Sequence, residues 1–149
     1  TKVIGRDIGL PNTNTSLGVF LTNAVLCMKP GAMNAANPTA VVQNCGMRFL
    51  KPLIELIRPK AIVTLGAVPA AAVLRAFNVS GQGAAFGEVF RNGPYALDGG
   101  EMRLFPMYHP GRLGQVGRAR AEPGAGTGWD LMRGDWARMA EALTVDQRS

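Results

Sequence analysis

The sequence predicts an α/β protein, a three-layer sandwich with a mainly parallel central sheet. Two observations predict this class. Short apolar runs of strand length alternate along the chain with longer segments in which apolar residues recur every three or four positions. The chain has 149 residues, of which 47% are hydrophobic, so we expect one domain over 1–149 with a sizeable core.

The first half of the chain predicts strand, helix, strand and helix in that order. Residues 19–26 form an apolar run with the length of a buried strand. An Asn-Pro pair then begins an amphipathic helix over 37–58. The run 61–65 is a second buried strand, Gly66 follows it directly, and 68–77 has the composition of a helix.

The second half predicts one further strand and a closing helix. The glycine-rich stretch 80–100 suggests short strands or a hairpin. The run 102–108 is a third strand that ends at His109, and 111–128 is polar enough for a loop or short helix. Apolar residues at helical spacing then predict a helix over 129–143.

Charge and hydropathy limit the kinds of partner. The chain carries 16 Lys and Arg against 10 Asp and Glu, a net charge of +6, which favours a polyanionic partner. No apolar run approaches the roughly 20 residues of a membrane span. The first residues do not resemble a secretory signal. We therefore expect a monomeric cytoplasmic protein with no membrane association, and we expect the protein's first segment to precede Thr1, since there is no initiator Met.

Three candidate site segments lie where predicted strands end, which is where open α/β sheets bind ligands. Asn23 has an amide that suits a base edge, or else a structural hydrogen bond. Gly66 offers backbone N–H groups to a phosphate, or else makes a tight turn. His109, with Pro110-Gly111 and Arg112-Leu113 after it, suits a donor to developing negative charge, or else a histidine satisfied by backbone.

The two cysteines have two interpretations. Cys27 and Cys45 flank a predicted loop and suit two of the four ligands of an iron–sulfur cluster, or else they are small buried residues. They are too few for a disulfide framework, and with one histidine they do not complete a structural zinc site.

Taken in order, four segments resemble the uracil-DNA glycosylase superfamily. They are Phe20-Leu21-Thr22-Asn23-Ala24-Val25-Leu26-Cys27, Pro59-Lys60-Ala61-Ile62-Val63-Thr64-Leu65-Gly66-Ala67, His109-Pro110-Gly111-Arg112-Leu113-Gly114 and Asp135-Trp136. The resemblance implies a DNA-binding hydrolase of base-excision repair that flips uracil out of DNA and cleaves its N-glycosidic bond.

The resemblance also implies roles for individual residues. Asn23 would bind the uracil edge, and His109 would be catalytic by donating to uracil O2. The remaining implied DNA contacts are Gly66 and Ala67 on a phosphate, the turn of Pro110 and Gly111, Arg112, and Leu113 as a wedge in the space left by the flipped nucleotide. Seven cations are available for DNA phosphates: Arg48, Lys51, Arg58, Lys60, Arg112, Arg118 and Arg120.

Some family features lack a counterpart in the sequence. The first family motif, with its water-positioning residue, and the aromatic residue that stacks on uracil are expected before Thr1. Cys27 and Cys45 resemble half of the [4Fe–4S] ligand set of the bacterial and archaeal iron–sulfur branch, so a cluster would require cysteines upstream. Two other functions stay open: a non-catalytic nucleic-acid-binding relative, and an unrelated nucleotide-binding enzyme with Gly66 on a phosphate and Asp98 on a ribose.

Overall fold

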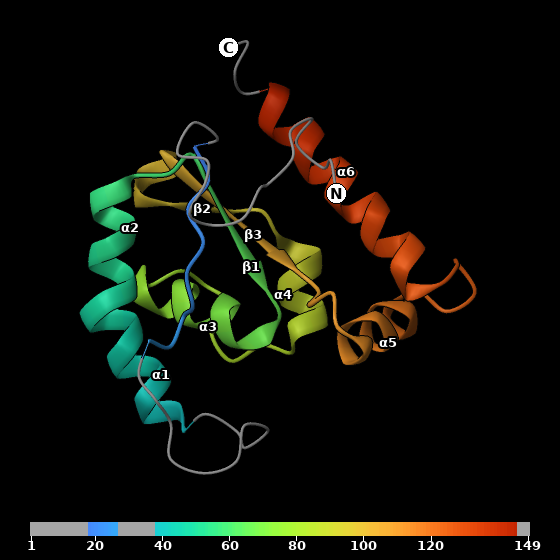
Figure 1. Ribbon diagram of the computed structural model, residues 1–149, viewed down its shortest axis with the longest axis horizontal. Coiled ribbons are helices and arrows are strands. Elements are labelled where there is room, and N and C mark those ends of the chain that lie inside the picture. The colour runs from blue at the N-terminus through green and yellow to red at the C-terminus, as the bar shows by residue number, and fades with distance from the viewer. Residues whose placement is uncertain (1–17, 27–37, 146–149) are drawn as a thin grey trace.

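The computed structural model describes residues 18–26 and 38–145. Its elements are α1 (Thr39–Cys45), the π-helical turn η2 (Gly46–Leu50), α2 (Lys51–Ile57), β1 (Ala61–Leu65), α3 (Ala67–Ala76), α4 (Phe86–Asn92), β2 (Tyr95–Leu97), the 3₁₀ turn η3 (Asp98–Gly100), β3 (Met102–Met107), α5 (Arg112–Ala121) and α6 (Gly128–Val145). Figure 1 shows these elements in chain order.

The sheet of the described residues has three strands in the order β1-β3-β2. β1 and β3 are parallel, with Leu65 opposite Met107 at their carboxyl ends. β2 runs antiparallel to β3, because the short turn η3 returns the chain directly to the neighbouring position. The α/β class is therefore confirmed, with a sheet that is mixed in direction.

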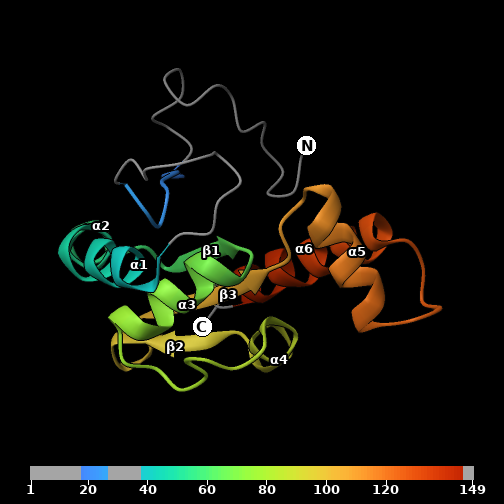
Figure 2. The same cartoon turned by 90° about the horizontal axis from the view of Figure 1, so that it is seen from below.

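Helices cover both faces of the sheet. Figure 2 shows α1, α2 and α3 on one side and α5 and α6 on the other. The main core lies between the sheet and the first group, where α1, η2, α2 and α3 place their buried aliphatic side chains against β3. Ala70, Leu74 and Leu104 are among the side chains that this packing removes from water.

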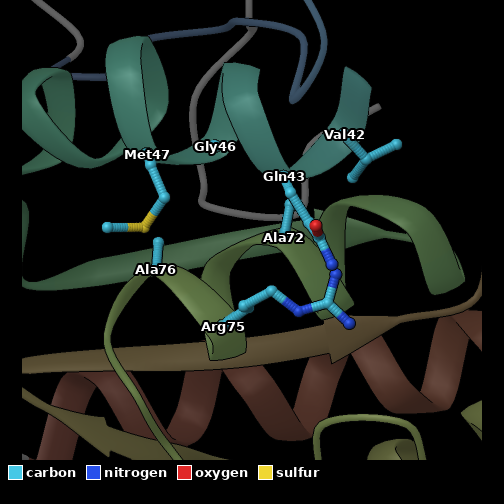
Figure 3. A pocket seen from close by; sticks show the side chains of 7 residues that line it. All are labelled: Val42, Gln43, Gly46, Met47, Ala72, Arg75 and Ala76. Carbon is cyan, nitrogen blue, oxygen red and sulfur yellow. The ribbon is translucent and has the colours of Figure 1, made fainter. Parts of the chain in front are cut away.

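Small residues bring α1 and η2 close to α3. A Cβ added at Gly46 would lie 3.8 Å from the carbonyl oxygen of Ala72, an ordinary contact distance. The pocket between these helices has a volume of about 10 Å³, and Figure 3 shows the side chains of Gln43 and Arg75 extending toward one another along it. Because this volume is at the limit for one water molecule, the pocket is a packing defect and does not bind substrate.

The expected strand over 19–26 is wrong. Residues 18–26 contain no strand, and Phe20 and Leu21 are 60% and 66% exposed. Only Ala24 and Val25 pack against the core. An apolar run forms a strand only where it can pair with the edge of a sheet. The edge strand β1 pairs with β3 alone among the described residues, so the run 19–26 has no strand partner there.

Two other expectations are refined. The stretch 80–100 contains the helix α4 in addition to the short strand β2, and 111–128 contains the ten-residue helix α5. The helix expected over 37–58 is present as α1, η2 and α2 in succession. Within the part of the chain that the structure describes, none of the helices has the length and hydrophobicity that crossing a bilayer requires.

Candidate active site

The carboxyl ends of β1 and β3 bring Gly66 and His109 together. The backbone N–H of Gly66 donates to the carbonyl of Met107 at 2.8 Å, which extends the pairing of β1 and β3 by one residue. Gly66 has a φ of 97°, a conformation that favours glycine, and a Cβ there would lie 3.6 Å from the Cβ of His109. The expected meeting of these two segments at one sheet edge is confirmed.

The backbone after His109 fixes the orientation of its imidazole. The N–H of Gly111 donates to Nδ1 of His109 at 3.0 Å. Since Nδ1 accepts this bond, the neutral ring carries its proton on Nε2. The His109 side chain is exposed, so the ring can present an N–H donor to a ligand at the end of the sheet.

The first turn of helix α5 packs closely against the main chain of His109. A Cβ at Gly114 would lie 1.9 Å from the carbonyl oxygen of His109, so only glycine fits there without movement of the backbone. The side-chain amide of Gln115 donates to the carbonyl of Pro110 at 2.8 Å and closes the turn. Arg112 and Leu113 occupy the first turn of α5, where Leu113 is 81% exposed.

Helix α3 begins at the same edge of the sheet. Ala67 is its first residue and is exposed, and Pro69 lies in its first turn, where its missing N–H costs no helical hydrogen bond. The amide groups of this first turn and the helix dipole suit an anion. The edge therefore combines an imidazole donor, an exposed leucine and the N-terminus of a ten-residue helix.

Asn23 lies on the segment 18–26, and its side chain is exposed. Its carbonyl accepts a weak bond from the Thr22 hydroxyl at 3.5 Å, while its amide makes no hydrogen bond to a described residue. The amide is thus not a structural partner of the described backbone. The role of Asn23 on a base edge stays a prediction.

The described residues do not form a cluster site by themselves. A [4Fe–4S] cluster takes four thiolates, and the 149 residues contain two cysteines. Cys45 is buried at the end of α1, and Cys27 lies outside the described residues. No group of three or more His, Cys, Asp or Glu suited to a metal occurs within 18–26 and 38–145.

Three of the expected DNA cations have acidic partners, the first being Lys51, which pairs with Glu55 at 3.6 Å on α2. Arg58 pairs with Asp98 at 3.2 Å and with Glu101, at the end of the sheet opposite His109. The carboxylate of Glu101 raises the pKa of Arg58. Arg118 is 1% exposed, so its assignment to DNA phosphates is wrong. Asp98, the acid of the alternative nucleotide site, is also at that opposite end and cannot serve a ligand at Gly66.

Arg118 instead belongs to a buried cluster behind His109 that sequence reasoning missed. Its Nε and Nη2 donate to the carboxylate of Asp135 on α6 at 2.6 and 3.0 Å, and these bonds raise the pKa of the guanidinium. The guanidinium also lies over the rings of Phe90 and Tyr108, at 5.1 and 6.0 Å from their centroids. The sequence shows the Asp-Trp pair at 135–136, but it does not show that Asp135 pairs with Arg118, 17 residues earlier.

Comparison with known proteins identifies the family of the chain. Residues 2–124 match the model of the uracil DNA glycosylase superfamily, and the chain belongs to this superfamily. A curated relative, the type-5 uracil-DNA glycosylase of Pyrobaculum aerophilum, is 32% identical over 106 residues, which cover 70% of this chain and 42% of the relative. The chain therefore spans about two fifths of that relative's length.

Proposed function

We propose that the protein excises uracil from DNA by hydrolysing the N-glycosidic bond of a flipped nucleotide. The observation that carries the proposal is the His109 imidazole, which the Gly111 N–H holds with Nε2 as the donor at the carboxyl edge of the sheet. Membership of the superfamily and the name of the curated relative support uracil as the base.

The proposed chemistry is stabilisation of the leaving base. As the glycosidic bond stretches, negative charge develops on the uracil ring, and the Nε2–H of His109 donates to its O2. A donor that is already oriented needs no reorganisation when the charge appears. The removal of one such donor typically slows the reaction about 10²- to 10³-fold.

The proposed DNA contacts surround this donor. Asn23 reads the uracil edge, and Gly66 and Ala67 hold a phosphate at the start of α3. The turn of Pro110 and Gly111 presents Arg112 to the DNA and Leu113 to the gap in the base stack. Leu113 is 81% exposed at the start of α5, beside the His109 turn, so its side chain is free to enter the gap.

The test compares His109→Ala with Leu113→Ala in the full protein. His109→Ala is expected to slow single-turnover excision about 10²- to 10³-fold while the Kd for uracil-containing DNA changes little. Leu113→Ala is expected to impair excision from duplex more than from single-stranded DNA, where unstacking costs less. The matched control is Val116→Ala, a half-exposed aliphatic residue one turn further along α5, which is expected to change neither rate.

Each outcome distinguishes the proposal from its alternatives. Tight binding of uracil-containing DNA with no excision by the unaltered protein would identify a non-catalytic relative. Equal losses in both variants on both substrates would reject the division of labour between donor and wedge. The proposal places the protein in the cytoplasm as a monomer that acts on DNA.

A further inference from the structure

The buried pair of Arg118 and Asp135 connects three elements behind the candidate active site. Arg118 lies on α5, Asp135 lies on α6, and the guanidinium covers Tyr108, the residue that precedes His109. Tyr108 is held edge-on by Phe86 and Phe90 of α4, at ring-centroid distances of 4.9 and 5.0 Å. The pair therefore fixes α5 and α6 relative to the end of β3.

A second contact continues this connection to the His109 turn. A Cβ at Gly128, the first residue of α6, would lie 2.0 Å from the carbonyl oxygen of Gln115, so α6 begins in direct contact with the α5 backbone. Gln115 in turn donates to the carbonyl of Pro110. Gly117 packs on the Tyr108 ring, where a Cβ would lie 3.4 Å from Cε1.

Stability alone does not explain a pair of this kind. Removing two charges from water costs free energy that their attraction does not always recover, and apolar side chains of similar size often replace such pairs without loss of stability. In addition, Nη1 of Arg118 is buried and makes no hydrogen bond to a described residue. The arrangement is costly for a core, but the planar guanidinium supplies directed bonds that an apolar contact lacks, two to Asp135 and one to Glu122 on its own helix.

We infer that Arg118 and Asp135 are positioning residues for the excision reaction. They hold α5 against Tyr108 so that the Gly111 N–H stays on Nδ1 of His109 and Leu113 stays on the same side of the sheet as Nε2. This inference rests on the proposed function for its effect on rate, whereas its effect on the His109 ring is independent of that function.

The deciding variant is the double substitution Arg118→Met with Asp135→Leu, which fills the space with apolar side chains. It is expected to keep the melting temperature within a few degrees and the Kd for DNA within about threefold, because no DNA-contacting residue changes. Single-turnover excision at saturating DNA is expected to fall about 10- to 100-fold, since a misplacement of about 1 Å can cost a factor of this size. The matched control is Asp130→Asn, which removes a carboxylate from an exposed pair on the same helix and is expected to leave the rate unchanged.

The imidazole ¹⁵N spectrum gives a readout that a merely structural role would not change. His109 is the one histidine in the 149 residues, and a His109→Gln sample assigns its signals. At a pH where an ordinary imidazole is neutral, the unaltered protein is expected to show one tautomer with the proton on Nε2. The double variant is expected to show a mixture of tautomers, because the Gly111 N–H no longer stays on Nδ1.

The two readouts separate the possible failures. A double variant with the single Nε2–H tautomer and the unaltered rate overturns the inference, and so does a rate that falls only in proportion to the unfolded fraction. If the double variant does not fold, Asp135→Asn, which keeps size and one acceptor, is measured in the same two ways. If the unaltered protein excises no uracil, the proposed function fails, and the tautomer comparison still decides the positioning role.

Discussion

Gly114 is the residue at which a single added methyl group is expected to reach the active site. It lies inside α5, where alanine is ordinarily preferred to glycine by about 1 kcal/mol. Here the added Cβ would lie 1.9 Å from the carbonyl oxygen of His109, so the backbone must move. Gly114→Ala is expected to lower single-turnover excision about 100-fold through displacement of the His109 turn.

A second helical glycine provides the control for that prediction. Gly134 lies inside α6, and a Cβ there would meet only Nη1 of Arg138, at 3.5 Å, which is an ordinary contact distance. Gly134→Ala is therefore expected to raise the free energy of unfolding by about 0.5–1 kcal/mol, with no loss of excision. Thermal unfolding and excision rates measured for both variants test the contrast, and equal behaviour of the two glycines would contradict it.

Among the elements, α6 has an N-terminus whose stability is expected to depend on pH. The Thr127 hydroxyl accepts the Asp130 N–H at 3.2 Å and donates to the Asp130 carboxylate at 2.6 Å. This hydrogen bond, with a further one from Arg133, lowers the pKa of Asp130. A carboxyl whose folded pKa is lowered stabilises the protein above its unfolded pKa, about 3.9, and this contribution is lost as the pH falls through the folded value.

Thr127→Ala is expected to lower stability at neutral pH by about 1 kcal/mol, the usual effect of a lost helix cap. The difference from the unaltered protein is expected to shrink below about pH 4, because protonated Asp130 no longer benefits from the hydroxyl. Denaturant unfolding at several pH values measures this dependence. Thr127→Ser, which keeps the hydroxyl, is the control, and a difference that persists unchanged in acid would contradict the explanation.

The individual helices and strands show how much local sequence can predict. Proline, glycine and apolar spacing were sufficient for β1, β3, α3 and α6, because each depends mainly on its own residues. The run 19–26 failed because a strand also depends on a partner edge. The meeting of Gly66 with His109 was predictable, since parallel strands end at one edge, whereas the pairing of Arg118 with Asp135 depends on how two helices pack.

At the scale of the whole molecule, two described arginines lie at opposite ends of the sheet in different surroundings. Arg112 is exposed at the candidate active site, while Arg58 is paired with acids at the opposite edge. In a plot of log Kd for DNA against log salt concentration, Arg112→Gln is expected to reduce the slope by about 1, as for the loss of one phosphate contact. Arg58→Gln removes the same charge and is expected to leave the slope unchanged, and equal slopes for the two variants would show that DNA does not favour the His109 edge.

The central place of β3 has a consequence for how the molecule opens. The amides of β3 exchange with solvent only after pairing with β1 or β2 is broken, whereas α5 can separate once its contacts with α6 and Tyr108 are lost. Opening of α5 is therefore expected to require less free energy than opening of the strand. Under the proposed function, α5 with Leu113 could leave the DNA while β3, which ends two residues before His109, stays folded, so release of DNA would not require the core to unfold.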